Sequence, residues 1–431
     1  MKYPFARLHT SLLSALSLIL SALGFLNLLI LARVFGIGSE TDSYFYALSV
    51  PSFIAALFIA FFTYSSVPVL LRSGGLNNSS RALYISSWLF SSIFFLLSLS
   101  YIISYILSLP LAPNAIKFDS LLFSIAWAFG GLQVVFGSLS AIFNSQRYFF
   151  SPLMLSSLST IGSLAGSLLT ISKPNIVIPL IGLLAGTIIA NLIGFFLLRG
   201  LLCGFRKTKL GDIKKLILGN AGFLATLLAT SSFGAYVLID AYFAPRFGVG
   251  SLSTLAFAQR IVIGFGGVAV YGIFSKVGPL FSEIFDKEGF SGLRPVVIKA
   301  TTKVAALSLF LAVFVWFNVG FLSSTIFRNK LQSSNLPSLF SLFSYMLPGM
   351  IFMLCSAVLL RAVLSIKNSN LHVTLFGIFV PSLYFFFCWL LASLGISSFG
   401  ISYLISWAIG FSILASRFRC PMSNISRTSF C

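Results

Sequence analysis

ARVFGIGSETD (residues 32–42) and APRFGVGSLST (residues 244–254) are two versions of one glycine-rich turn, each following a long apolar run. Aligned so that Ala32 corresponds to Ala244, they share the pattern A-x-x-F-G-x-G-S, and the same offset pairs Phe45 with Phe257. A single F-G-x-G-S match would be weak evidence. The longer agreement, near the start of each half of the chain, indicates an internal duplication, and such a repeat decides the architecture.

The composition is typical of a membrane protein. Of the 431 residues, 58% are hydrophobic and only 8% are charged, whereas about 25% of the residues of a soluble domain are charged. The formal net charge of +20 is explained by the Lys and Arg excess of cytoplasmic loops, so we expect no nucleic acid partner. The five cysteines form no C-x-x-C pair, which predicts no metal site and no redox cofactor.

Apolar windows of about 20 residues, the length that crosses a bilayer as a helix, predict about twelve spans. They are residues 11–35, 43–71, 83–109, 118–143, 152–172, 177–199, 217–243, 251–281, 300–326, 336–364, 370–394 and 397–417. An open sheet would leave backbone groups unpaired in lipid, so the fold is predicted to be all-α. With the N-terminus inside, most of the 28 Lys and Arg fall on the cytoplasmic side. We therefore expect a multi-pass protein of the bacterial inner membrane with both termini cytoplasmic.

The duplication and the span count predict two six-helix bundles related as internal repeats. The expected divisions are an N-terminal bundle at 1–199, a basic cytoplasmic linker at 200–216, a C-terminal bundle at 217–417 and a cytoplasmic tail at 418–431. Paired bundles are a common plan for transporters, in which the substrate passes between the halves. No nucleotide-binding loop of the form G-x-x-x-x-G-K-[ST] and no catalytic triad is found, so we expect no enzyme.

The glycines of the repeated turn also have a local explanation. Gly36 and Gly38 are expected to take positive φ and to end the first span. Ser39 and Asp42 resemble a capping box that would start the second span. The residues predicted to act as turns or hinges are Gly36, Gly38, Gly248, Gly250 and Pro51.

Residues 28–70 and 238–283 resemble the MurJ/MviN family of lipid II flippases, within the superfamily of multidrug, oligosaccharidyl-lipid and polysaccharide exporters. The first match consists of the A-R-x-F-G-x-G turn, the following T-D, Pro51 and the closing V-P-V-L. Residues 345–370 resemble the family's tenth helix more weakly. The resemblance implies a flippase that moves an undecaprenyl-diphosphate-linked glycan precursor from the inner to the outer leaflet by alternating access.

Several family positions are changed in this chain. Where the family places arginines along its first helix to hold the diphosphate, the chain has Ser21 and Asn27, and the Asp-Arg pair of helix eight is Gln259-Arg260. Three alternative functions therefore stay open. They are a flippase for O-antigen or another surface-polysaccharide repeat unit, a multidrug/cation antiporter, and a non-transporting envelope scaffold.

Two charged residues inside spans are the strongest site candidates. Arg260 lies nine residues into its span, on the order of 13 Å from the end at ~1.5 Å per residue. A charge at that depth costs at least ~2.5–3.5 kcal/mol, so it should face a cavity that binds an anionic group, or else pair with backbone carbonyls or Asp240. Asp240 is a candidate for coupling to protons, sodium or the membrane potential. Its alternative is an interfacial ion pair with Arg246 or Arg260.

Uncharged polar residues complete the candidate set. Gln259 and Asn27 are expected to hydrogen-bond substrate, although such groups also link helices to one another. Arg361 matches an arginine of the family's tenth helix and is expected at the cavity mouth, where extension of its side chain to the membrane surface is the alternative. The predicted partners are a lipid-linked glycan and the surrounding membrane lipids.

Overall fold

The computed structural model describes residues 9–62, 70, 76–106, 119–146, 148, 150–202, 223–327, 336–366 and 370–419, and this part is helical without strands. Its α-helices are α1 (His9–Phe35), α2 (Ser39–Phe61), α4 (Leu76–Ile106), α5 (Ser120–Ser145), α6 (Phe150–Leu169), α7 (Val177–Leu202), α9 (Phe223–Phe243), α10 (Ser251–Phe327), α11 (Leu336–Ser365), α12 (Asn370–Leu390) and α13 (Ser397–Arg419). Most of the linker predicted at 200–216 and of the tail predicted at 418–431 lies outside the described residues.

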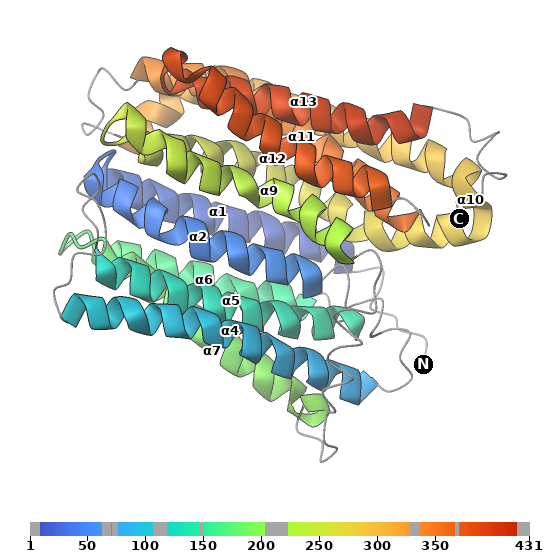
Figure 1. Cartoon of the computed structure of the whole chain (residues 1–431), viewed down its shortest axis with the longest axis horizontal. Helices are drawn as coiled ribbons and strands as arrows, with labels where there is room; N and C mark the ends of the chain where they lie inside the picture. The colour runs from blue at the N-terminus through green and yellow to red at the C-terminus, as the bar shows by residue number, and fades with distance from the viewer. Residues whose placement is uncertain are drawn as a thin grey trace.

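Helix α10 contains two of the predicted spans. Gly289 interrupts it with a φ of 67° and a ψ of −157°, so that residues 251–288 and 290–327 form two arms. Glycine adopts this positive φ without the steric cost that a Cβ would bring. In Figure 1 the yellow ribbon of α10 runs to the right-hand end of the molecule and returns in the upper layer. With α10 counted as two arms, the described helices follow the order of the predicted spans.

The helices have the length and composition of membrane spans. Ten of them, within the described residues, are long and apolar enough to cross a bilayer, and α1 adds a shorter apolar stretch at Ala22–Phe35. Large apolar side chains are exposed on the outside, for example Leu96 on α4, Leu197 on α7 and Phe317 on α10. Lipid is the medium in which such a surface is stable, because lipid tails need no polar covering.

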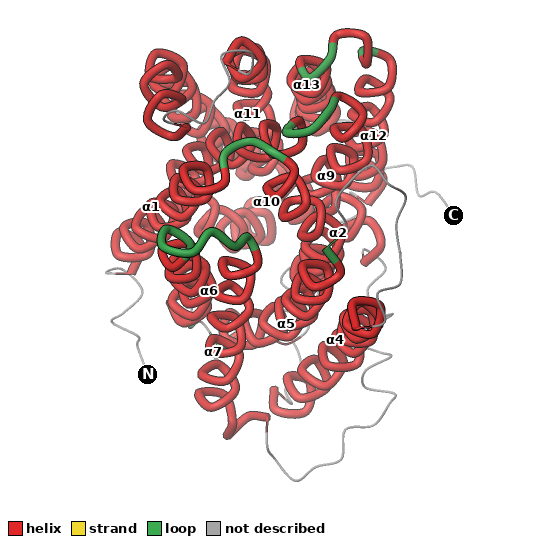
Figure 2. The backbone as a smooth tube through the Cα atoms, turned by 90° about the vertical axis from the view of Figure 1, so that its left-hand side faces the viewer, coloured by secondary structure: helices red, strands yellow, loops and turns green. Residues whose placement is uncertain are grey.

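The two halves have the same pattern of helix contacts. In the first half α1 packs on α6, α4 and α2 on α5, α5 on α7, and α6 on α7. The equivalent contacts in the second half are α9 on α12, α10 on α11, α11 on α13, and α12 on α13. Figures 1 and 2 show the two groups of helices one above the other. The predicted all-α fold of two related bundles is therefore confirmed.

The halves meet along four helices. Helix α1 packs on α10 and α2 packs on α9, and exchanging the halves converts one contact into the other. A single cluster of buried apolar side chains crosses this boundary and includes Leu31, Phe45 and Phe257. The centre of the molecule is thus formed by the helices that flank the two glycine-rich turns.

Close helix packing in the first half depends on small residues. A Cβ on Gly162 of α6 would overlap the carbonyl oxygen of Gly182 on α7, and a Cβ on Gly182 would overlap that of Gly162. Small residues at such positions allow helix backbones in a membrane to approach closely. Beside this contact the Thr187 hydroxyl donates to Ser159 Oγ at 3.0 Å.

Candidate functional site

The two glycine-rich turns lie together at one end of the helices, called here the turn end. Gly36 has a φ of 71°, and Gly248 and Gly250 have φ values of 104° and 90°. Gly38 is different, because its φ of 177° is extended backbone that any residue adopts. The predicted positive φ is therefore correct for Gly36 and wrong for Gly38.

Asp42 joins the two turns. Its Oδ2 accepts a hydrogen bond from the backbone N–H of Gly250 at 2.6 Å, and its Oδ1 accepts one from Ser253 N–H at 2.7 Å. These donors belong to the start of α10, where backbone N–H groups have no helical partner, and a carboxylate there also interacts favourably with the helix dipole. No side chain caps α2 itself. The predicted Ser39–Asp42 capping box is wrong, because Asp42 caps a helix of the other half.

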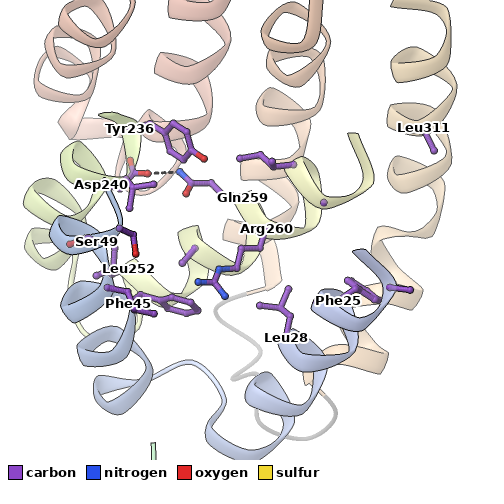
Figure 3. Close-up of a pocket in the computed structure, with 18 residues that line it drawn as sticks. Phe25, Leu28, Phe45, Ser49, Tyr236, Asp240, Leu252, Gln259, Arg260 and Leu311 are labelled. Atoms are coloured by element: carbon purple, nitrogen blue, oxygen red, sulfur yellow. Dashed lines mark hydrogen bonds between the residues drawn. The ribbon is translucent and has the colours of Figure 1, made fainter. Parts of the chain in front are cut away.

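A cavity of about 810 Å³ lies between the halves (Figure 3). It is bounded by α1 and α2 on one side and by α9 and both arms of α10 on the other. Its lining residues are Ala22, Gly24, Phe25, Leu28, Phe45, Leu48, Ser49, Ser52, Tyr236, Val237, Asp240, Leu252, Ala256, Gln259, Arg260, Ile263, Gly264 and Leu311. A volume of this size is within the range of small-molecule binding sites.

Equivalent positions of the two repeats line opposite walls of this cavity. At the offset that pairs Ala32 with Ala244, Gly24 corresponds to Tyr236, Leu28 to Asp240 and Leu48 to Arg260, and all six residues line the cavity. The first half contributes apolar or small side chains at these positions, and the second half contributes polar or charged ones. At these three pairs of equivalent positions the polar and charged side chains are therefore confined to the second half, while the rest of the lining is mostly apolar on both sides.

Arg260 extends from α10 into the cavity, as Figure 3 shows. Its guanidinium carbon lies 4.7 Å from the centroid of the Phe45 ring, which is a cation–π contact between the two halves. The side chain is exposed to the cavity, and no described carboxylate forms an ion pair with it. A guanidinium in contact with an aromatic ring still has N–H groups available for an anion.

Asp240 is bonded within the second half. Its Oδ2 accepts from the Gln259 side-chain amide, and its Oδ1 accepts from the Tyr384 hydroxyl of α12 at 2.6 Å. The residue is only 2% exposed although it borders the cavity. In the described part of the chain it forms no ion pair with Arg246 or Arg260. Arg246 instead stacks on Tyr242, with its guanidinium carbon 4.5 Å from the ring centroid.

The other predicted residues lie elsewhere. Asn27 is buried between α1 and α6, where its amide donates to Ser163 Oγ at 3.0 Å and its Oδ1 accepts from Ser167 at 2.6 Å. Arg361 is on α11 and is not among the cavity-lining residues. Helix α2 continues through Pro51, which is buried. The structure thus brings together Asp240, Gln259 and Arg260.

The residues of this region that were not predicted as site residues include Phe45, Tyr236 and Tyr384. Phe45 carried a signal, because it is one of the repeat identities. Tyr236 and Tyr384 are single aromatic residues in apolar helices, and nothing in the sequence relates Tyr384 to Asp240, which is 144 residues away. Only the packing of α12 against α9 brings them into contact.

Comparisons with known proteins agree with this architecture. The family model described as lipid II flippase MurJ matches residues 31–430. A solved structure described as lipid II flippase MurJ in an inward closed conformation is 18% identical, with a TM-score of 0.76, covering 95% of this chain and 87% of that chain. No curated protein matches by sequence.

Transporters of the wider superfamily share the fold. An inward-facing multidrug resistance MATE family transporter is 14% identical with a TM-score of 0.70, covering 94% of this chain and 98% of that chain. A transporter of the MOP superfamily from Pyrococcus furiosus, described as having a binding pocket of reverse polarity, is 14% identical with a TM-score of 0.67, covering 95% of each chain. At these identities the likeness describes the fold alone.

Proposed function

The chain belongs to the lipid II flippase MurJ family, and from this premise we propose that it moves an undecaprenyl-diphosphate-linked glycan precursor from the inner to the outer leaflet of the bacterial inner membrane. It is a multi-pass membrane transporter of lipid-linked glycan and not an enzyme. The identity of the glycan, the direction of its movement and the protein's location in the bacterial inner membrane are what we propose.

The observation that carries the proposal is a largely apolar cavity in which Arg260 and Asp240 are the charged lining residues. A lipid-linked sugar has a charged phosphate beside an apolar chain, so it needs both kinds of surface. Arg260 supplies a planar cation suited to phosphate oxygens, and Leu28 and Leu48 supply apolar surface opposite. In this arrangement the headgroup lies against the second half.

We propose alternating access for the movement itself. The Asp42 bonds to Gly250 and Ser253 close the turn end, and opening that end requires both bonds to break. The excess of Lys and Arg on the side of the termini supports assigning the turn end to the outer face. Rocking of one half against the other then exposes the cavity to each leaflet in turn.

Asp240 is the proposed coupling residue. It borders the cavity, is almost fully buried and lies beside the proposed phosphate site. A buried carboxylate in a membrane is stable only with hydrogen-bond partners or a bound cation. Coupling to protons, sodium or the membrane potential would let an ion gradient reset the carrier.

Arg260→Ala tests the proposal in proteoliposomes that contain fluorescent lipid II. We expect binding and flipping to fall by about ten- to a hundredfold, the loss of a charge-assisted contact of about 1.5–3 kcal/mol. Arg246→Ala is the matched control, because Arg246 stacks on Tyr242 and does not line the cavity. Equal losses in both variants, or none in Arg260→Ala, would contradict the proposed site.

Depletion in the host identifies the glycan. Lipid II accumulating on the cytoplasmic side supports the proposed substrate. If another lipid-linked glycan accumulates, the substrate is a surface-polysaccharide repeat unit and not lipid II. If no lipid-linked intermediate accumulates, the flippase proposal fails.

A further inference from the structure

Gln259 and the buried Asp240 both line the cavity and are hydrogen-bonded to each other. The amide nitrogen of Gln259 donates to Asp240 Oδ2, while Gln259 itself lines the cavity next to Arg260 (Figure 3). We infer that a proton binding to Asp240 transfers the Gln259 amide from Asp240 to the substrate headgroup, so that protonation of Asp240 strengthens substrate binding. The inference rests on the proposed function and names a proton as the ion that Asp240 binds.

The two carboxylate oxygens of Asp240 have different surroundings. Oδ1 accepts from Tyr384, a 3% exposed residue of α12 that does not line the cavity. Oδ2 accepts from Gln259, which does. Because Tyr384 occupies Oδ1 from the protein interior, a proton arriving through the cavity reaches Oδ2. Tyr384 is therefore a positioning residue.

The exchange of hydrogen bonds follows from the donors and acceptors that Asp240 and Gln259 have before and after protonation. A carboxylate oxygen that takes a proton from cavity water becomes an O–H donor and a weaker acceptor, so it holds the amide N–H of Gln259 less strongly. The O–H can donate to the amide oxygen or to water, and the released N–H can donate to a phosphate or sugar oxygen. Oδ1 still accepts from Tyr384. No covalent bond other than O–H forms or breaks.

The charges of Asp240 and Arg260 also favour binding of an anionic headgroup once Asp240 is protonated. Among the described lining residues Arg260 is the cation and Asp240 is the anion, so their charges cancel while Asp240 is ionised. Protonation leaves the charge of Arg260 uncompensated beside the headgroup. At short range in a low-dielectric site this strengthens the attraction of an anion. Substrate binding and proton binding therefore favour each other by linkage.

The other groups around Asp240 are uncharged near neutral pH apart from Arg260. They are Tyr236 on α9, Gln259 and Arg260 on α10, Tyr384 and Cys388 on α12, and Tyr403 on α13. The Tyr403 hydroxyl donates to Met353 Sδ at 2.9 Å and not to the carboxylate. Tyr403 is consequently a matched control for Tyr384.

Infrared titration of the full-length protein in nanodiscs tests the proton site. The chain has only eight Asp and Glu residues, so the carbonyl band of one protonated carboxyl is resolvable. We expect a titrating band that Asp240→Asn removes. Tyr384→Phe should shift its midpoint and frequency, and Tyr403→Phe should leave both unchanged. If the band survives Asp240→Asn, or Tyr384→Phe has no effect, the inference is overturned.

Lipid II binding to the same nanodiscs tests the exchange. Wild-type affinity should rise about tenfold on acidification, the worth of one hydrogen bond of about 1.4 kcal/mol. Gln259→Ala should remove most of this rise and retain Arg260-dependent binding. A full rise in Gln259→Ala, or affinity that follows sodium and not pH, overturns the inference. If lipid II binding does not depend on Arg260 at any pH, the proposed function fails instead.

Discussion

Phe45 of α2 and Phe257 of α10 occupy the same position in the two repeats and meet edge to face, with ring centroids 5.3 Å apart and planes at 90°. Equivalent residues can touch only where they lie beside the axis that relates the repeats. That axis therefore passes close to the cavity. Near this axis, equivalent positions of the two halves carry different side chains, such as Leu28 and Asp240 or Leu48 and Arg260.

The contact between Phe45 and Arg260 can be tested with its own repeat partner as control. Phe45→Leu removes the cation–π contact, worth about 0.5–2 kcal/mol, and should weaken lipid II binding by several-fold. Phe257→Leu removes the same edge-to-face ring contact but leaves the ring under Arg260. Native mass spectrometry of both variants gives the affinities, and melting curves check the fold. Equal affinities would show that the ring does not hold the guanidinium.

Asp42→Asn should loosen the turn end. An Asn side chain has one acceptor oxygen, so it can satisfy only one of the two N–H groups that Asp42 binds. Each bond to a charged acceptor contributes about 1.5–3 kcal/mol, so protection of the Gly250 and Ser253 amides against hydrogen exchange should fall at least tenfold. Peptides of α5, whose cap is Asp119, should be unchanged. Unaltered protection at Gly250 would mean that the turns stay closed without Asp42.

Gly250→Ala should disrupt the same docking for two reasons. The φ of 90° is strained for any residue with a Cβ, and that Cβ would lie 2.6 Å from Ile37 Cγ2. Adding Ile37→Ala removes the overlap but not the backbone strain, which costs of order 1–3 kcal/mol. We expect partial recovery of the melting temperature in the double variant. Complete recovery would show that crowding alone requires glycine.

Gly182→Ala should destabilise the first half by a few kcal/mol, comparable to other overpacked core sites at about 1–3 kcal/mol. Gly200, on the same helix, has open space at its Cβ position, so Gly200→Ala should be neutral or stabilising by up to about 1 kcal/mol. Thermal unfolding of both variants in one detergent provides the comparison. Equal melting temperatures would contradict the close approach of α6 and α7.

The sequence predicted the fold well because lipid imposes simple rules. Apolar length and the repeated turn were sufficient for helix order and for two related bundles. The fine structure of the turns was predicted less well, since Gly38 and Gly250 have the same residue type at equivalent positions but different φ values. Contacts between the two halves determine these φ values. Such contacts depend on tertiary packing, which cannot be predicted from the local sequence of a turn.

The position of Arg260 could be predicted from the energetic cost of a charge in a membrane span. That cost predicted a cavity or a partner for Arg260, and it lines the cavity together with Asp240. Burial of Asn27 costs little free energy because its side chain is hydrogen-bonded to Ser163 and Ser167. These serines belong to α6, which is far from Asn27 in the sequence. The partners of Asp240 likewise come from α10 and α12. Pairings over such separations follow from the fold and not from spacing.

The unequal side chains at equivalent cavity positions predict unequal tolerance to substitution. Leu28 and Leu48 contribute apolar shape, whereas the aligned Asp240 and Arg260 contribute charge. A deep mutational scan should therefore find that positions 28 and 48 accept many apolar residues, whereas positions 240 and 260 accept almost none.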